Sequence, residues 1–177
     1  MNSDTVSNLA ENKLILLYTL SKIELPISNQ QINKFILDNK FMNYFSMQEY
    51  LNELCEDKLV SSTEYEGKSC YLLTDKGRKI LEYFSGHIPK VVKVQIDLNI
   101  PNIKKSVKNE LFITSNLKHK SNNDYIVECK IKEQDFDLIN LKLHVGSKPN
   151  ANNICVNWKK HSEIIYNDII DILTKKR

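Results

Sequence analysis

SNQQINKFILDNKFMNYFSMQEYLNELCEDKLVSSTEYEGKSCYLLTDKGRKILEYFSG, residues 28–86, is the stretch of the sequence that decides the fold. Ser28-Asn-Gln-Gln31 and Ser46-Met-Gln-Glu49 each have the pattern of a capping box, in which a Ser side chain accepts from a helical N–H and a Gln or Glu side chain reaches back. After each box, apolar residues recur at helical spacing. These are Ile32, Phe35, Ile36, Tyr50, Leu51 and Leu54. The pattern predicts two consecutive helices, each with one face to bury.

A hairpin and a third helix are predicted next. Leu59–Tyr65 and Ser69–Leu73 are short β-like runs, and the Glu66-Gly67 pair between them can supply the positive φ that a tight turn needs. Thr74 is a helix N-cap residue type, and the helix that it starts should end at Gly86. Two helices, a two-stranded ribbon and a third helix in this order indicate a helix-turn-helix with a wing.

The order of these elements resembles the winged helices of the MarR and PadR repressor groups. The run Leu73-Thr-x-x-Gly-x-x-x-Leu81, directly after the wing, is the part most similar to them. More specifically, the chain resembles an uncharacterised family of short winged-helix proteins from low-GC Gram-positive bacteria, and this likeness spans nearly its whole length. The runs that carry it are Asn12-Lys-Leu-Ile-Leu-Leu17, Met42-Asn-Tyr-Phe45, Gln48-Glu-Tyr-Leu51 and Ile154-Cys-x-Asn-Trp158-Lys159. The resemblance implies the architecture; it implies no particular activity, because a fold does not fix a function.

The remaining N-terminal half contributes one more helix and a connection. Asn8 is the expected cap of a first helix that runs to about Glu24, and Pro26 separates it from the next element. Residues 40–45 should connect the two capped helices, with a short strand there as an alternative. Residues 92–98 alternate like a strand, but we favour a connecting helix, followed by a second short helix that starts at Pro101.

The C-terminal half predicts a sheet covered by a helix. Strands are expected at 111–118, 125–132 and 136–145, where apolar and polar residues alternate. From 151 onward, Ala151, Ile154, Trp158, Ile165, Ile169 and Ile172 recur at helical spacing. The predicted class is therefore α+β: an N-terminal winged helix-turn-helix domain, 1–88, and a C-terminal α/β dimerisation or interaction domain, 89–177, with a three-stranded antiparallel sheet under a long helix.

Charge is unevenly divided between these halves. Residues 1–88 hold 9 Lys or Arg against 12 Asp or Glu, whereas residues 89–177 hold 16 against 10. Because affinity for DNA comes largely from cations that neutralise phosphates, this charge balance counts against strong DNA binding by the acidic N-terminal half alone, without excluding it. The expected source of additional phosphate contacts is the basic half, through Lys104, Lys105, Lys108, Lys118, Lys120, Lys159 and Lys160.

No motif in the 177 residues indicates an enzyme. With only four glycines, the sequence contains no Gly-rich phosphate loop, nucleophile elbow or zinc-protease motif. The four cysteines have no metal-ligand spacing and are interpreted as buried reduced thiols. His161 is interpreted as a packing residue of the last helix. We therefore expect no catalytic residues, no metal and no cofactor.

No apolar run approaches the ~20 residues that span a bilayer, and the N-terminus has no signal-like pattern, so we expect a cytoplasmic protein without a membrane partner. The favoured function is a bacterial transcription regulator that binds double-stranded DNA as a homodimer. The candidate DNA contacts are Ser46, Met47, Gln48 and Asn52 of the second capped helix, with Lys34, Lys40 and Lys68 on the DNA backbone. The candidate dimer interface is formed by Trp158, Ile165, Ile169, Ile172 and Leu173. The alternative is a winged-helix module that binds another protein and not DNA, which the Glu49 and Glu53 carboxylates favour.

Overall fold

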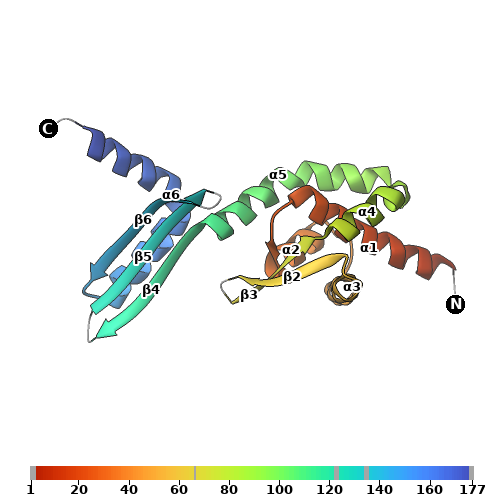
Figure 1. Ribbon diagram of the computed structural model, residues 1–177, viewed down its shortest axis with the longest axis horizontal. Coiled ribbons are helices and arrows are strands. Elements are labelled where there is room, and N and C mark those ends of the chain that lie inside the picture. Colours follow the sequence, from red (N-terminus) through yellow and green to blue (C-terminus); the bar gives the residue numbers. More distant parts are fainter. Residues whose placement is uncertain (1–2, 66, 122–123, 134–135, 176–177) are drawn as a thin grey trace. The chain divides into compact units, whose positions relative to one another are not determined.

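The computed structural model describes residues 3–65, 67–121, 124–133 and 136–175 (Figure 1). In these ranges the chain forms six α-helices and two three-stranded antiparallel sheets, which confirms the α+β class at that level. The chain divides into two compact units, Met1–Val107 and Lys108–Arg177.

Helices make up most of the N-terminal unit. They are α1 (Ser3–Ile23), α2 (Asn29–Asp38), α3 (Tyr44–Glu56), α4 (Asp75–Phe84), the 3-10 turn η1 (Ser85–His87) and the greater part of α5 (Lys90–Phe112). The start predicted for the first helix at Asn8 is wrong, because α1 begins at Ser3. The core is built from fully buried aliphatic side chains of α1, α2 and α3, which include Leu16, Leu17, Leu20, Ile32, Ile36, Leu51 and Leu54.

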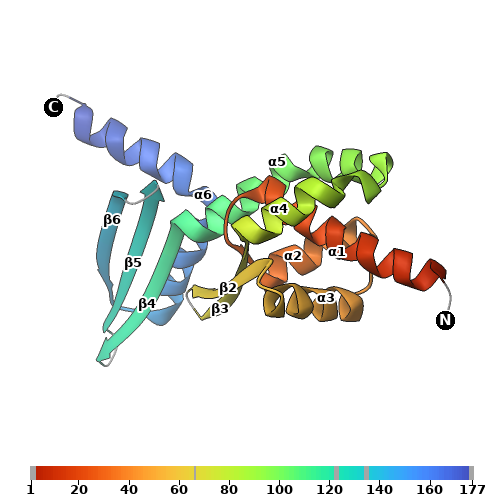
Figure 2. The same ribbon diagram turned by 45° about the vertical axis from the view of Figure 1, so that its right-hand side comes forward.

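The first predicted capping box is confirmed at the start of α2. The Ser28 hydroxyl accepts from the Gln31 N–H (3.4 Å), and the Gln31 side-chain oxygen accepts from the Ser28 N–H (3.3 Å). Two otherwise unpaired N–H groups of the first turn are satisfied in this way. Figure 2 shows α3 beside α2, with the β2–β3 hairpin next to both helices.

The first sheet has the strand order β1-β3-β2, with β1 at Ile27–Ser28, β2 at Val60–Tyr65 and β3 at Lys68–Leu73. The predicted hairpin is confirmed, with Gly67 at φ 74° beside its turn; Glu66 lies outside the described residues. The alternative short strand in 40–45 is wrong. Its place beside β3 is taken by β1, which precedes α2, because Ile27 is buried and pairs with Tyr71.

The Leu-Thr-x-x-Gly run that follows the hairpin forms a tight contact between the start of α4 and Leu59. Thr74 caps α4 by accepting from the Gly77 N–H (3.0 Å), and the Thr74 N–H donates to the Leu59 carbonyl (3.1 Å). This cap holds the first turn of α4 so close to Leu59 that a Cβ on Gly77 would overlap the Leu59 carbonyl oxygen. A glycine is needed here for close backbone approach. The helix ends at Phe84, and the expected terminator Gly86 lies within η1.

The preference for helix over strand at 92–98 is confirmed by α5. The expectation of two short helices is wrong, because α5 runs through Pro101 as one helix. Its first part belongs to the N-terminal unit, where Ile96 and Val107 are fully buried. Polar contacts add to this packing, since the Gln95 side chain donates to the Asn39 carbonyl (3.1 Å).

The C-terminal unit contains the second sheet and the last helix. Strands β4 (Ile113–Ser121), β5 (Asp124–Glu133) and β6 (Phe136–Val145) are antiparallel in the order β4-β5-β6, and α6 (Lys148–Thr174) covers one face. The three strands and the long helix were all predicted, with bounds that differ by a few residues. Trp158 is the anchor of the buried cluster, and its indole N–H donates to the Lys130 carbonyl (3.2 Å).

The helix α6 is broken at His161, whose φ of −129° and ψ of 21° are not helical. The interpretation of His161 as a packing residue is wrong, because its side chain is exposed. Before the break, Ala151 and Trp158 are buried against the sheet. After it, Ser162 is still buried and Ile165 still packs against the cluster, and the rest of the helix extends beyond the sheet (Figure 1). This second half of α6 leaves Ile164, Ile170, Ile172 and Leu173 exposed.

Replacement of Gly77 by Ala should destabilise the protein by about 2 kcal/mol or more, because the added methyl group meets a backbone carbonyl that α3 and β2 hold in place. Urea denaturation followed by far-UV circular dichroism measures this free energy. The matched control is Gly86→Ala, where a Cβ meets no atom within 4 Å. Equal stability of the two variants would contradict the packing role of Gly77.

Candidate nucleic-acid interface

The helix α3 begins earlier than its predicted capping box. The N-cap is Asn43, whose side-chain oxygen accepts from the Ser46 N–H (2.9 Å). The Ser46-to-Glu49 box is therefore wrong, because Ser46 already lies in the first turn. This places Tyr44 and Phe45, which were assigned to the connection, on the helix.

Helical spacing decides which side chains of α3 reach solvent, because Met47, Tyr50, Leu51 and Leu54 form its buried face. Of the four residues predicted to contact DNA bases, Met47 has an exposed fraction of 0% and points into the core. Ser46 and Gln48 are half-buried, and Asn52 is exposed. The Asn52 amide is the side chain of this set that is presented to solvent, and an amide can form bidentate hydrogen bonds with adenine.

Gln48 has partners within the protein. Its side-chain amide and that of Asn29 exchange two hydrogen bonds, at 2.7 and 3.1 Å, and Asn29 also donates to the Tyr71 hydroxyl (3.3 Å). Burial raises the pKa of Tyr71 above its ordinary value. These contacts join α2, α3 and β3, so Gln48 first of all orients α3 relative to α2.

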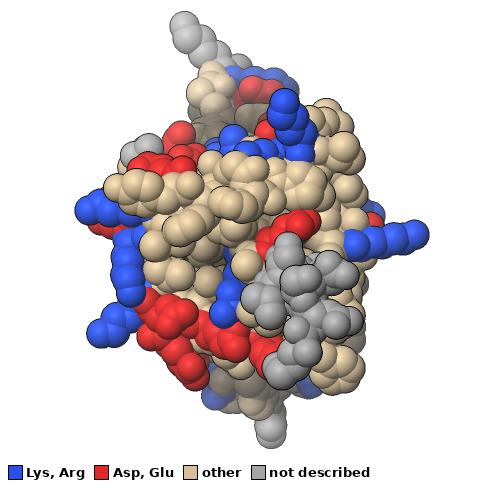
Figure 3. All heavy atoms as spheres, turned by 90° about the vertical axis from the view of Figure 1, so that its right-hand side faces the viewer, with Lys and Arg blue, Asp and Glu red and all other residues tan. Residues whose placement is uncertain are grey.

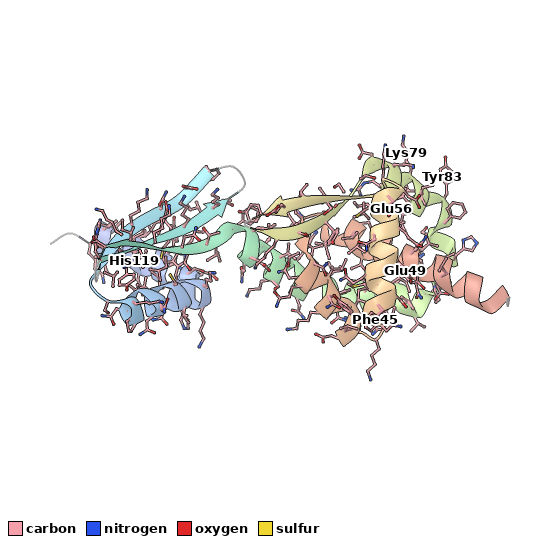
Figure 4. All side chains as sticks on the ribbon, turned by 90° about the horizontal axis from the view of Figure 1, so that it is seen from below. Phe45, Glu49, Glu56, Lys79, Tyr83 and His119 are labelled. Carbon is pink, nitrogen blue, oxygen red and sulfur yellow. The ribbon has the colours of Figure 1, made fainter. Side chains whose placement is uncertain are left out.

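The acidic residues of α3 differ in their surroundings. Glu53 forms an ion pair with Lys13 of α1 (2.7 Å), which neutralises its charge, whereas Glu49 and Glu56 are exposed. Figure 4 shows Phe45, Glu49 and Glu56 along the length of α3. Sequence reasoning missed Phe45, whose exposed fraction of 80% is unusual for a Phe. The solvent face of α3 is therefore acidic, with the exposed aromatic side chains of Tyr44 and Phe45 at its start.

The three lysines expected on the DNA backbone come from separate elements of the N-terminal unit. Lys34 lies on α2, Lys40 follows α2 with a left-handed φ of 57°, and Lys68 begins β3 next to the hairpin turn. All three are exposed.

A basic surface lies on the outer face of the second sheet. Val127 and Cys129 are buried under α6, so the alternating residue Glu128 faces the other way. Around this one carboxylate stand three ammonium groups: Lys130 at 3.2 Å, Lys142 at 3.5 Å and Lys118 at 3.9 Å. The hydrogen bond with Lys130 is the main cause that lowers the pKa of Glu128. Lys132 occupies an outward position on β5, opposite Asp137 of β6, so the excess of cations on this face is centred on Glu128.

The other lysines that were expected to supply phosphate contacts are spread over several elements. Lys104 pairs with Glu24 (3.0 Å) in the N-terminal unit, whereas Lys105 and Lys108 are exposed on α5 and Lys159 and Lys160 on α6.

The five residues of the predicted dimer interface fall into two groups. Trp158 is only 2% exposed, and Ile165 packs against the same buried cluster. Ile169 is half-buried, whereas Ile172 and Leu173, at the end of α6, are exposed, Leu173 by 76%. Only the second group offers an apolar surface to another molecule.

All four cysteines are free thiols. Burial is the main cause that raises the pKa of Cys129 to about 11, so this thiol stays protonated near neutral pH. No three His, Cys, Asp or Glu side chains of the described residues gather as a metal site requires. In the same ranges, no helix has both the length and the apolar character needed to cross a bilayer.

The lowered pKa of Glu128 gives an expected pH dependence. A carboxyl group with a lowered pKa in the folded state contributes stability above its ordinary value of 4.5, and this contribution is lost as the pH falls through the lower folded value. Urea unfolding between pH 7 and pH 3, followed through Trp158 fluorescence, should show a loss of stability in acid that is smaller in Glu128→Gln. The control is Glu133→Gln, on the same strand, where the carboxylate has no ion pair with a described residue. A Glu128→Gln profile identical to that of the unsubstituted protein would contradict the role of the cluster.

Among comparisons with known proteins, one with family models found a match. A search of curated proteins and a search of solved structures each found no match. The family model described as Domain of unknown function (DUF4364) matches residues 12–173, from within α1 to one residue before the end of α6. Since this match covers nearly the whole chain, the protein belongs to the DUF4364 family.

Proposed function

We propose that this protein is a non-enzymatic, cytoplasmic transcription regulator that binds double-stranded DNA as a homodimer, through a winged helix-turn-helix of the MarR or PadR kind. The observation that supports it most is the succession of α2, α3, the β2–β3 hairpin and α4 in one compact unit. In this interpretation α3 is the recognition helix and the hairpin is the wing. Residues 1–88 carry the DNA-reading elements, and residues 89–177 serve dimerisation.

The contacts between elements support this assignment. The amide pair of Asn29 and Gln48 fixes α2 against α3, as a recognition helix requires, and Lys68 stands at the tip of the proposed wing. Asn52, which is exposed on α3, would read a base, and the exposed Lys34 and Lys40 would contact phosphates. Binding would be salt-dependent to the extent that these cations neutralise phosphates.

The outer face of the second sheet would add affinity. Lys118, Lys130 and Lys142 share the single carboxylate of Glu128, so their combined charge is positive. A homodimer doubles this charge, and electrostatic attraction to DNA rises with it. This surface would compensate for the exposed glutamates of α3.

The homodimer is proposed to form through residues 162–174 of α6. Ile169, Ile172 and Leu173 stand at i, i+3 and i+4 and so share one side of the helix, and Ile172 and Leu173 are exposed there, as apolar residues at an interaction site are. A second copy offers the same helix, and twofold pairing of two identical surfaces covers both at once.

A different function is supported by the solvent face of α3. Phe45, Glu49 and Glu56 form an acidic surface with an aromatic anchor, which is typical of a protein interface and unfavourable beside phosphates. Tyr83 of α4, 81% exposed, would extend this surface (Figure 4). The alternative is therefore an interaction module that docks a basic protein on α3.

Substitutions on α3 separate the two functions. If α3 reads DNA, Asn52→Ala should cost about 1–3 kcal/mol on the preferred site and relax its specificity. Glu49→Gln should increase affinity for all sequences, because a negative charge leaves the phosphate surface. The measurement is fluorescence anisotropy with genomic DNA fragments at two salt concentrations. We leave Gln48 unchanged because its loss would also loosen the contact with α2.

Lys34→Ala is the control for that experiment. It should weaken binding to every fragment equally and reduce the salt dependence, because a phosphate contact carries no sequence information. Absence of saturable DNA binding at low salt, together with capture of a basic protein that Phe45→Ser abolishes, would replace the proposed function by the alternative.

Leu173→Asp should convert the dimer into a folded monomer. Because Leu173 is exposed within the isolated chain, the carboxylate has no core to disrupt, but it would be buried without a partner in the dimer. Light scattering should give twice the 20.6 kDa of one chain for the unsubstituted protein and 20.6 kDa for the variant. Val156→Asp, at an exposed position before the break in α6, should remain dimeric. A monomeric unsubstituted protein at micromolar concentration would rule out the proposed assembly.

A further inference from the structure

A cavity of about 560 Å³ opens at one side of the N-terminal unit, among α1, α3, α4 and η1. Its size falls within the range of about 300–1,000 Å³ that is typical of small-molecule sites. The apolar part of its wall comes from Leu14, Leu17, Leu54, Leu59, Ile80 and Phe84. Leu17 and Leu54 are almost completely buried core residues, so the floor of the cavity is held by the packing of α1 against α3.

The charged groups of the cavity are mainly acidic. Glu11, Lys13 and Asp57 line it, but the Lys13 ammonium is paired with the Glu53 carboxylate at 2.7 Å. Neither Glu11 nor Asp57 has an ion pair with a described residue. Lys76 approaches Asp57 through the backbone carbonyl (2.7 Å) and not through the carboxylate. Glu11 is therefore the carboxylate with the least compensation from nearby cations.

Two aromatic rings complete the wall. Phe84 and His87 lie with ring centroids 6.0 Å apart, and the His87 ring nitrogen is 3.2 Å from the Phe84 carbonyl. The face of an aromatic ring attracts a cation and offers nothing comparable to an anion. On the side of the N-terminal unit from which α1 begins, a broad uncharged area has acidic side chains gathered along one border (Figure 3).

We propose that this cavity binds a small apolar organic cation, with its hydrocarbon body against the leucines and its ammonium group near Glu11. An anion of the same size would meet the carboxylates of Glu11 and Asp57, and a neutral hydrocarbon would leave them unused. The site goes beyond the proposed function, because binding requires neither DNA nor a second copy of the chain. Leu54 of α3 and Asp57, its C-cap, belong to the wall, so a ligand here touches the end of the same helix whose solvent face is proposed to read DNA.

The test compares two ligands that share a naphthalene ring and carry opposite charges. The probes are 2-naphthylmethylammonium and 2-naphthoate, titrated into the full-length protein without DNA by isothermal calorimetry. The cation should bind at least ten times more tightly than the anion. Glu11→Gln should weaken cation binding about three- to tenfold, and Asp57→Asn should have a smaller effect because Lys76 is near. Glu56→Gln removes an acidic charge of α3 outside the cavity and should leave the affinity unchanged.

Ala10→Trp provides the steric test. Ala10 lines the cavity and is exposed, so a larger side chain there should fill the space without unfolding the protein, which circular dichroism verifies. This variant should bind the cation at least ten times more weakly. Equal binding of both probes, tighter binding of the anion, no binding of either, or full binding by Ala10→Trp would each overturn the proposal. If the protein is a dimer and Ala10→Trp makes it monomeric, the proposal would also be overturned, because the cavity would then be a contact between two copies of the chain.

Discussion

The backbone carbonyl of Leu59 is the contact that joins the β2–β3 hairpin to α4 in the N-terminal unit. It accepts from the Thr74 N–H (3.1 Å), the Thr74 hydroxyl lies 3.0 Å away, and the first turn of α4 packs on it through Gly77. The Leu59 N–H in turn donates to Leu54 at the end of α3 (2.9 Å). One residue thus connects the end of α3, the start of β2 and the cap of α4. Any change in the position of α3 must be accommodated at this residue.

The sequence was sufficient to predict the elements whose causes are local. A capping box at Ser28, a glycine beside the hairpin turn and a Thr cap before Gly77 each act within a few residues, and each was found where it was expected. The sequence contains two possible N-cap residues for α3, Asn43 and Ser46, and the helix is capped by Asn43. Met47 lies at helical spacing with Tyr50, Leu51 and Leu54, so its burial was available from the sequence pattern. The exposure of Phe45 on α3 was not, because it depends on the helix beginning at Tyr44 and not at Ser46.

Long-range packing accounts for the remaining differences. Pro101 was expected to start a helix, but burial of Ile96 and Val107 on either side of it holds α5 as one element. The periodic apolar residues of α6 predicted one continuous stripe, yet the break at His161 assigns its two halves to different environments. The lysines of the C-terminal half were evident from composition. Their gathering around Glu128 depends on the pairing register of three strands, which no short segment specifies.

The central physical problem of the proposed function is the charge on α3. Two of its polar side chains are already engaged within the protein, Gln48 with Asn29 and Glu53 with Lys13. The groups left for a partner include an amide and two exposed glutamates, so the helix itself would repel a phosphate backbone. Attraction to DNA must then come from cations elsewhere, and it would be long-ranged and sensitive to salt. The same helix would attract a basic protein directly and at short range. DNA binding would therefore depend on the charge of cations outside α3, whereas binding of a basic protein would depend on the carboxylates of α3 itself.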